Sequence, residues 1–380
     1  MVFSVPSKTF LAGEYLAVLG GPSLVIATTP RFWLAMKSAD QADEIATAQI
    51  LNKKFKLESK SRDDRFVPLR DWSKVFHPES PVGLFLSSDL EKCIQQNPAL
   101  KEMQFQFVDP YQSVGNQSVN SISSPKILGG FGASSAQYLL MKWALDQMQL
   151  PSPIKLDSAK YVDPTKRKTE AVASTELVSM ESKMNSDLWK MWIGDYQKVS
   201  GGASGADLTA HLQGGISYFE RKTNTRKKLA FRFANIGFSL FSTGIKIKTH
   251  EHLKTFRSDP MQLEKALGYE KIVLQMRQSL EENDELLFID SINNAKDFLL
   301  ANNWVADSTK ALLKKIEATD NNQKVILATK GCGALGADTI LVAHRQNIDI
   351  SSWRRQMQDQ LGLIFVAGNQ DIAEGILYHE

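Results

Sequence analysis

The stretch Gly129–Ser135 carries three glycines and two serines and leads directly into an apolar segment, Ala136–Leu145, that is typical of a helix. The first turn of a helix has unpaired N–H groups and the positive end of the dipole, and glycines let an anion approach the backbone closely. The pattern therefore suits a polyphosphate. It is neither a Walker A loop, which needs Gly-Lys-Ser/Thr, nor a GxGxxG fingerprint. A plainer interpretation, in which Ser134 or Ser135 caps the helix, fits the same residues.

Two more glycine-rich turns follow along the chain. The first, Ser204–Asp207, precedes the apolar stretch Leu208–Leu212. An aspartate at a helix start is most often a cap, but the Asp207 carboxylate also suits a group that orients or deprotonates a substrate hydroxyl. The second turn, Lys330–Asp338, holds three glycines between two predicted strands. Such a loop can touch a ligand, although a plain hairpin uses glycines as well.

Strands and helices that position these turns occur without strict alternation, which predicts an α+β fold. Short apolar runs bounded by Gly or Pro predict strands, and apolar residues that share a helical face predict helices. The predicted strands are 10–12, 15–19, 23–27, 32–36, 50–57, several within 216–250, 325–329, 339–344 and 363–367. The predicted helices are 82–96, 136–145, 165–190, most of 251–318, and 351–361. A boundary between 200 and 220 divides the chain into the predicted domains 1–212 and 213–380.

Composition excludes several other classes of protein. A chain of 380 residues exceeds the usual size of one hydrophobic core, and its 43% hydrophobic and 23% charged residues are ordinary for a globular protein. The net charge of +3 is too small to create a positive electrostatic field that would attract nucleic acid or an anionic membrane. Two cysteines, Cys93 and Cys332, predict neither a disulfide framework nor a zinc site. Without a long apolar run or a signal-like N-terminus, we expect a cytoplasmic protein.

Taken in order, these motifs resemble those of the GHMP kinases, the family of galacto-, homoserine, mevalonate and phosphomevalonate kinases. Val5–Tyr15 with Gly20–Leu24 resembles the first family motif, a Pro-Gly-Lys stretch followed by Gly-Glu-His or Gly-Glu-Tyr. Gly130–Ala136 resembles the Gly-Leu-Gly-Ser-Ser-Ala phosphate loop, and Lys330–Asp338 resembles the third motif. Ser204–Asp207, followed by two glycines at 214 and 215, resembles the segment with the catalytic aspartate. The resemblance spans residues 5–345.

Within the family, the phosphomevalonate kinases are the most similar group. The Gly-Glu-Tyr of the first motif, the Ser-Gly-Ala-Asp-Leu-Thr-Ala stretch and the final Asp338 of the third motif all resemble that group. The alternatives are a mevalonate kinase, a decarboxylase of diphosphomevalonate, and a non-catalytic regulator with the same fold. The chain departs from the family pattern at Ser7, which replaces the glycine of Pro-Gly-Lys, and at Leu335, which replaces a glycine and should stiffen the third loop.

The resemblance implies a two-domain fold, with a ferredoxin-like C-terminal domain and an active site in the cleft between the domains. It implies ATP and Mg²⁺ as cofactors, a small-molecule substrate, and a monomer or homodimer that binds neither nucleic acid nor membrane. Asp207 would act on the acceptor oxygen, and Lys8 would lie beside it and stabilise the transferring phosphoryl group. The residues expected to bind ATP are Gly130, Gly132, Ala133, Ser134, Ser135 and Gly333, with Ser134 or Ser135 as the Mg²⁺ ligand.

Other roles stay open at this level. Three basic residues near the motifs are candidates for a substrate phosphate: Arg31, Lys126 and Lys198. An acidic Mg²⁺ ligand has three candidates in one predicted helix, with no basis for choosing among them: Glu170, Glu176 and Glu181. The polar stretch 113–125, just before the phosphate loop, is a candidate for a mobile lid.

Overall fold

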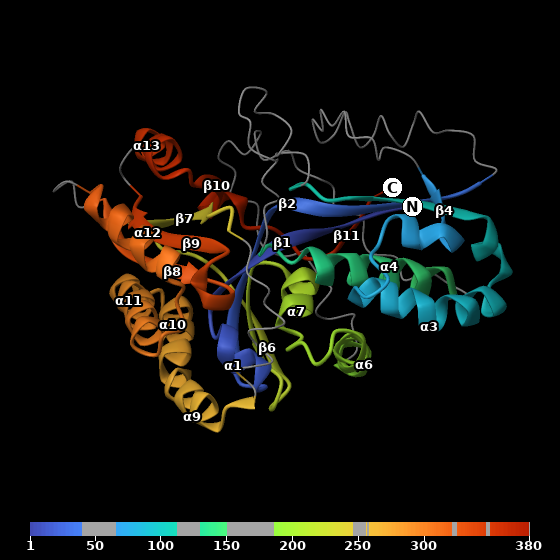
Figure 1. The fold of residues 1–380 in the computed structure, drawn as a ribbon, viewed down its shortest axis with the longest axis horizontal. Coiled ribbons are helices and arrows are strands. Elements are labelled where there is room, and N and C mark those ends of the chain that lie inside the picture. The colour runs from blue at the N-terminus through green and yellow to red at the C-terminus, as the bar shows by residue number, and fades with distance from the viewer. Residues whose placement is uncertain are drawn as a thin grey trace.

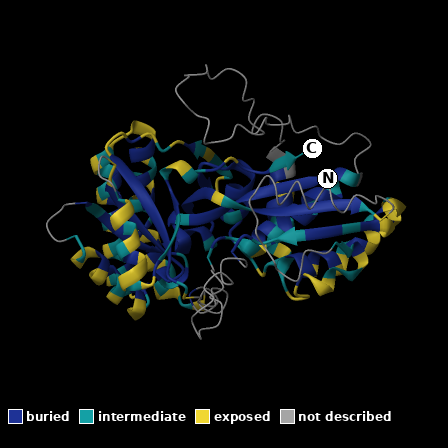
Figure 2. Ribbon diagram, turned by 90° about the horizontal axis from the view of Figure 1, so that it is seen from above, coloured by how far each residue is buried: buried dark blue, intermediate teal, exposed yellow. Residues whose placement is uncertain are grey.

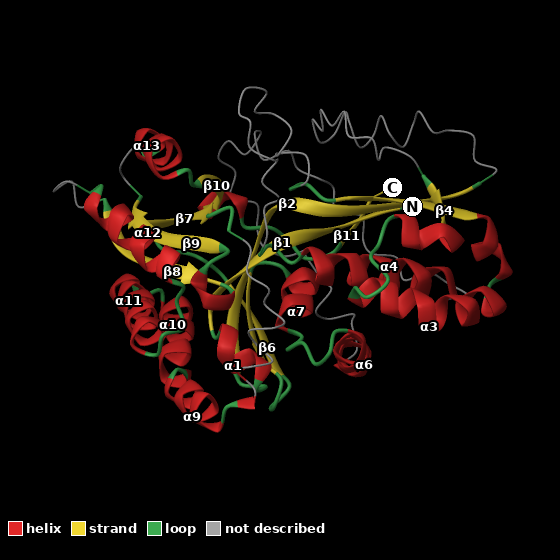
Figure 3. Ribbon diagram, in the orientation of Figure 1, coloured by secondary structure: helices red, strands yellow, loops and turns green. Residues whose placement is uncertain are grey.

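The computed structural model describes residues 1–39, 66–111, 130–149, 186–245, 256, 258–320, 325–346 and 350–379. Within these ranges the chain forms two antiparallel sheets with helices packed on them (Figures 1 and 3). The predicted strand 50–57, the polar stretch 113–125 and most of the predicted helix 165–190 lie outside the described residues.

The first sheet has the strand order β11-β1-β2-β4-β3, and the hairpin β5-β6 pairs with β2. Its strands are β1 (Val2–Ala12), β2 (Pro22–Ser38), β3 (Val67–Pro68), β4 (Met103–Val108), β5 (Ile216–Glu220), β6 (Thr225–Leu229) and β11 (Leu377–His379). The long strand β2 pairs with β5 through its first residues and with β4 through its last. Strands from both sides of residue 212 thus share this sheet, and the boundary between 212 and 213 stays a prediction.

Helices cover one face of the first sheet and build the core of this half. They are α3 (Pro81–Gln96), α4 (Ala133–Gln149), α6 (Ser186–Val199) and α7 (Ala206–Gln213). Both α4 and α7 pack on β1 and β2, so the start of each helix lies near the middle of the long strands (Figure 1). The packed face is apolar, with Leu139, Leu140 and Leu208 fully buried. The core therefore holds two helix N-termini against β1.

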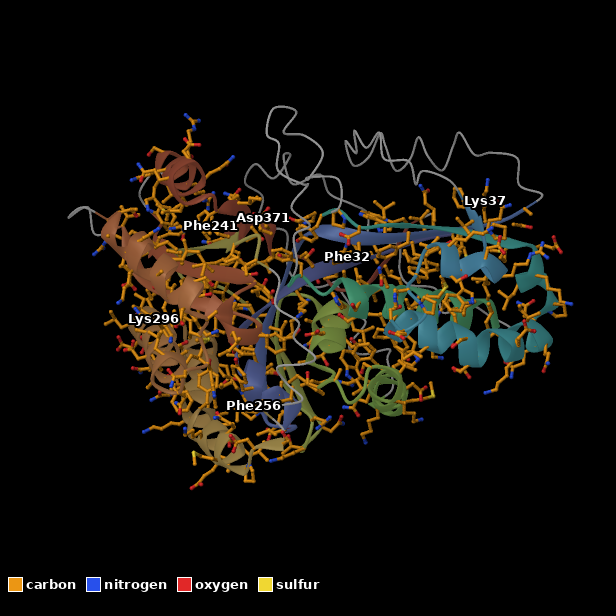
Figure 4. The ribbon with its side chains drawn as sticks, viewed as in Figure 1. Phe32, Lys37, Phe241, Phe256, Lys296 and Asp371 are labelled. Atoms are coloured by element: carbon orange, nitrogen blue, oxygen red, sulfur yellow. The ribbon has the colours of Figure 1, made fainter. Side chains whose placement is uncertain are left out.

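The second sheet lies between two helical layers. Its order is β10-β7-β9-β8, formed by β7 (Ile236–Ser242), β8 (Ile326–Cys332), β9 (Thr339–Arg345) and β10 (Ile364–Gly368). The helices are α9 (Pro260–Gly268), α10 (Glu270–Glu282), α11 (Glu285–Ala301), α12 (Asp307–Ala318) and α13 (Ser351–Leu361). Successive strand residues face opposite layers, as period-two geometry requires. Leu240 packs with α10 and α11, whereas Phe241, which Figure 4 labels, packs with α12 and α13. Figure 2 shows the strands buried and the outer helix faces exposed.

The α+β class predicted from the sequence is confirmed, and two local predictions are wrong. The run at 15–19, predicted as a strand, is the short helix α1 (Glu14–Val18). Its first four residues are all buried, so the run has no polar face that distinguishes helix from strand. The separate strands 23–27 and 32–36 are one strand, β2, because the break at Thr29 and Pro30 is only a shift in register with β1. In the described part of the chain, no helix is both long and apolar enough to cross a membrane.

Candidate active site

Lys8 and Asp207 form an ion pair between β1 and α7. The Lys8 Nζ lies 3.1 Å from the Asp207 Oδ1, and the two side chains are 10% and 27% exposed. The register of β1 with β2 shifts between Pro6 and Ser7, directly before Lys8, and irregularities of this kind commonly redirect a side chain near a functional site. An ammonium group and a carboxylate therefore meet at a largely buried position, and the Asp207 side chain is the more exposed of the two.

The start of α7 explains why Asp207 is available. Gly205, with φ 86°, is the N-cap residue and makes no side-chain cap, so Asp207 lies one residue inside the helix. A Cβ atom at Gly205 would lie 2.7 Å from the Ile193 Cγ2, which leaves room only for glycine. The capping interpretation of Asp207 is therefore wrong. Its carboxylate faces Lys8 at the positive end of the helix dipole.

The predicted phosphate loop lies against Lys8. Gly130 and Gly132 both have φ 88°, a left-handed conformation that favours glycine. The Lys8 N–H donates to the Phe131 carbonyl at 3.1 Å, and a Cβ atom on Gly132 would lie 2.8 Å from the Lys8 Cγ. Helix α4 begins at Ala133, directly after the loop. The unpaired N–H groups of its first turn thus lie next to the ion pair.

The two serines of the loop differ in exposure. Ser134 is exposed, whereas Ser135 is only 1% exposed. The Ser135 hydroxyl lies 2.9 Å from the Gly132 carbonyl and 2.9 Å from the His211 Nε2. Because α4 begins at Ala133, both serines lie inside its first turn, and neither is the residue before the helix. Of the two hydroxyls, that of Ser134 is the one open to a ligand.

The third glycine turn closes against the phosphate loop. Gly333 has φ 85°, and a Cβ atom there would lie 2.7 Å from an Asp338 carboxylate oxygen. A Cβ atom on Gly130 would lie 2.4 Å from the Asp338 Cβ, so the second and third turns touch through this side chain. Leu335, where the family has glycine, takes φ 51°, and its N–H donates to the Tyr15 hydroxyl at 3.1 Å. This bond holds the strained residue in place.

A buried ion pair joins the first turn to the third. The Lys330 Nζ lies 2.8 Å from the Glu14 Oε1, and the side chains are 0% and 6% exposed. Lys330 also donates to the Gly331 carbonyl at 3.0 Å. Burial raises the pKa of the neighbouring Cys332 to about 11, so its thiol is neutral at pH 7. The motif residues Glu14 and Lys330, to which the sequence assigns no role, thus connect β8 to the start of α1.

Ser7 and Tyr111 support the loop from the other side. The Tyr111 hydroxyl donates to the Ser7 Oγ at 2.8 Å, and Ser7 donates to the Pro30 carbonyl. The Tyr111 ring stacks on Phe131 with 4.4 Å between ring centroids. The serine that departs from the family pattern therefore accepts a buried hydrogen bond that glycine lacks. Nothing in the sequence pattern marks Tyr111.

His211 is the other residue that sequence reasoning missed. It is fully buried on α7, four residues after Asp207 and therefore on the same helix face. Its Nδ1 lies 2.8 Å from the Pro6 carbonyl, and its Nε2 contacts Ser135 and the Gly132 carbonyl, the latter at 3.2 Å. Burial lowers the pKa of His211 to about 4, so the imidazole is neutral at pH 7.

Of the basic residues considered for a substrate phosphate, two are used elsewhere. The Arg31 guanidinium donates to both oxygens of Ser4 and to the carbonyls of Glu374 and Gly375, which ties the C-terminal segment to β1 and β2. Lys198 forms an exposed pair with Asp195 at 3.0 Å. The Arg31 contacts argue against that candidate, whereas Lys198 stays a prediction because an exposed pair leaves its ammonium group accessible. The remaining candidates, Lys126, Glu170, Glu176 and Glu181, lie outside the described residues.

The described residues contain no group of three His, Cys, Asp or Glu side chains that would hold a metal by themselves. A Mg²⁺ ion in a nucleotide site takes most of its oxygen ligands from phosphates and water, so a single protein hydroxyl or carboxylate is enough there. The exposed hydroxyl of Ser134 on α4 and the carboxylate of Asp207 on α7 are oxygen donors of this kind.

Comparisons with known proteins agree on the fold. No family model and no curated protein matches the sequence. The phosphomevalonate kinase of Streptococcus pneumoniae, in complex with phosphomevalonate and AMPPNP, aligns with a TM-score of 0.58 at 14% identity over 97% of this chain and 99% of that one. The mevalonate kinase of Methanococcus jannaschii aligns with a TM-score of 0.54 at 12% identity over 98% of both chains. The galactokinase of Lactococcus lactis, complexed with galactose, aligns with a TM-score of 0.55 at 11% identity over 99% and 94%.

These alignments cover nearly the whole of each chain, so the match is not confined to one half. The chain therefore has the fold of the GHMP kinases, as the ordered motifs predict. At such identities the likeness establishes the fold alone, and the activity has to be argued from the site.

Proposed function

We propose that this protein is an ATP-dependent small-molecule kinase, and that its preferred acceptor is phosphomevalonate. The observation that carries the kinase assignment is the Lys8–Asp207 ion pair, 3.1 Å long, beside a glycine loop that leads into the N-terminus of α4. Phosphoryl transfer depends on positioning and charge neutralisation more than on covalent chemistry. The site supplies a cation, a carboxylate and aligned N–H groups, which are the elements needed for that task.

The nucleotide phosphates would be bound by backbone rather than by side chains. Gly130 and Gly132 have no side chains that would cover the backbone of the loop. The N–H groups of Ala133 and Ser134 belong to the first turn of α4, at its N-terminal end. Gly333, held against Asp338, would border the same phosphates from the third turn. In this proposal Ser135 supports the loop from inside, because its hydroxyl is turned to His211.

Mg²⁺, when bound with the nucleotide, neutralises phosphate charge and fixes the phosphate geometry. Ser134 is the residue that we assign to hold it, since its hydroxyl is exposed and that of Ser135 is not. Asp207 would orient the acceptor oxygen, and with an alcohol acceptor it would also take the proton. Lys8 would pair with the Asp207 carboxylate and stabilise the negative charge on the transferring group.

The choice of acceptor rests on the motif residues. The Gly-Glu-Tyr of the first motif and Asp338 of the third favour phosphomevalonate, which is itself a phosphate and needs no strong base. In that case Asp207 would mainly position the substrate. Mevalonate is the second candidate acceptor, supported by the same loop and ion pair, which serve an alcohol equally well.

A side-by-side assay tests the proposal. ATP consumption is measured with phosphomevalonate, mevalonate and galactose as acceptors, using the wild-type protein and the Asp207→Asn variant. Turnover with phosphomevalonate that the variant loses supports the proposal. Turnover with mevalonate alone would move the protein to the second candidate, and release of carbon dioxide from diphosphomevalonate would identify a decarboxylase. A protein that consumes ATP with none of these compounds contradicts the proposed function.

A further inference from the structure

His211 is placed where three elements of the candidate site meet. It lies on α7, one turn after Asp207, and its Nδ1 is 2.8 Å from the carbonyl of Pro6, two residues before Lys8 on β1. Its Nε2 is 2.9 Å from the hydroxyl of Ser135 on α4. A Cβ atom on Gly132 would lie 2.9 Å from the same nitrogen, so the loop backbone rests directly on the ring.

The hydrogen-bond chemistry assigns each ring nitrogen a separate task. Nδ1 faces the Pro6 carbonyl, which can only accept a hydrogen bond, at 2.8 Å. Nε2 lies 2.9 Å from the Ser135 hydroxyl, which donates to the Gly132 carbonyl, and 3.2 Å from that carbonyl itself. One ring nitrogen therefore contacts the strand that carries Lys8, and the other contacts the helix that begins at the phosphate loop.

The surroundings hold the ring in one orientation. His211 is fully buried, and its ring lies nearly perpendicular to that of Phe32 of β2, with 6.5 Å between centroids and an interplanar angle of 88°. The nearby charges are those of Lys8 and Asp207, which already pair with each other. A rotation of the ring would break both hydrogen bonds at once and leave buried polar groups without partners.

We propose that His211 is a positioning residue that holds the Lys8 strand, the Asp207 helix and the phosphate loop in the geometry needed for transfer. The inference rests on the proposed kinase function. A displacement of about 1 Å between reacting groups costs on the order of a hundredfold in rate, so one residue that fixes three elements controls the rate without touching the substrate.

The alternative is that His211 is only a satisfied core residue. The chain offers a matched control for this, because His344 on β9 is also buried and makes the same two types of contact. Its Nε2 lies 3.1 Å from the Ser239 Oγ, and its Nδ1 lies 3.0 Å from the Arg345 carbonyl. Those partners belong to the second sheet and hold none of the catalytic elements.

The test uses two substitutions, each of which keeps a polar group near the position of one ring nitrogen and removes the other. His211→Asn leaves a donor near the Nδ1 position and removes the contact with Ser135, so we expect the KM for ATP to rise about tenfold. His211→Gln leaves a polar group near Nε2 and removes the contact with β1, so we expect kcat to fall about ten- to a hundredfold with little change in KM. The same substitutions at His344 should lower thermal stability and leave kcat and KM within about twofold.

Binding of AMPPNP with Mg²⁺, measured by calorimetry, separates this inference from the proposed function. If the wild-type protein turns over no acceptor but binds AMPPNP, the kinase assignment fails, and an unchanged affinity in His211→Asn would then overturn the inference too. If the wild-type protein turns over phosphomevalonate and both His211 variants match the His344 variants, the inference alone is wrong. Should the His211 variants not fold, Ser135→Ala removes the same contact and is expected to weaken AMPPNP binding in the same direction.

Discussion

Replacing Lys330 with methionine is expected to destabilise the protein strongly, because it leaves a carboxylate buried without its cation. The Lys330 Nζ and the Glu14 Oε1 are 2.8 Å apart, with side chains 0% and 6% exposed. At an effective dielectric constant of about 20, this distance gives a gross attraction of about 6 kcal/mol. Desolvation of two ions costs a comparable amount, so the net contribution of the pair is small. Removing Lys330 leaves the desolvation cost of the Glu14 carboxylate without its compensating attraction, and the free energy of unfolding is expected to fall by about 3–5 kcal/mol.

The assay is denaturant unfolding at pH 7 of the wild-type protein, Lys330→Met, Glu14→Gln and the double variant. The double variant should recover at least half of the loss, since a neutral amide replaces the unpaired carboxylate. Lys310→Met serves as the control, because its pair with Asp307 is at the surface and should change stability by less than about 1 kcal/mol. The reasoning is refuted if Lys330→Met stays within about 1 kcal/mol of wild type, or if the double variant is no more stable than the single one.

Three further predictions concern the candidate site. Lys8→Met and Asp207→Asn should each lower turnover at least about a hundredfold while the fold persists by circular dichroism, and a near-wild-type rate in either folded variant would remove its role. Removing the hydroxyls of Ser134 and Ser135 together should weaken binding of the Mg²⁺–ATP complex, with most of the loss already present in Ser134→Ala; unchanged nucleotide affinity in the double variant would count against the phosphate loop. Burial lowers the pKa of His211 to about 4, below its usual value near 6.5. Between these two pH values the unfolded chain binds a proton at His211 that the folded chain does not. The residue therefore costs no stability above pH 6.5, and it lowers the free energy of unfolding by up to about 3 kcal/mol as the pH falls toward 4. Unfolding measured between pH 4 and pH 7 should have a shallower pH slope in His211→Gln than in wild type, and equal slopes would contradict this.

Local chemistry accounts for what was predictable. Helix α3, predicted at 82–96, is observed at Pro81–Gln96, because its apolar residues return on one face and Pro81 suits a first turn. Gly130, Gly132 and Gly333 all take the left-handed backbone that only glycine adopts without strain. Such features depend on neighbours in the chain, so they can be predicted without knowing the tertiary fold.

Short apolar runs mark the limit of that approach. The run at 15–19 has no periodicity, and it became a helix because Gly13 turns the chain and its carbonyl accepts from the Ala17 N–H at 2.8 Å. Thr29 and Pro30 predicted a break between two strands, yet β2 continues through them, because a proline is tolerated where no ladder bond is needed. In the first case the turn at Gly13 determined the outcome, and in the second the pairing of β2 with β1 did.

The amino-acid sequence alone determined the α+β class, the three glycine turns and the identity of Lys8 and Asp207 as the residues to examine, because each depends on residue type and local backbone. Only the tertiary structure decided how these parts are held together. His211 meets Ser135 across 76 residues, and Lys330 meets Glu14 across 316. A buried polar group must find a partner wherever the fold places one, and that partner has no fixed spacing along the chain. The supporting residues of the site are therefore set by packing, whereas its loops are set by local sequence.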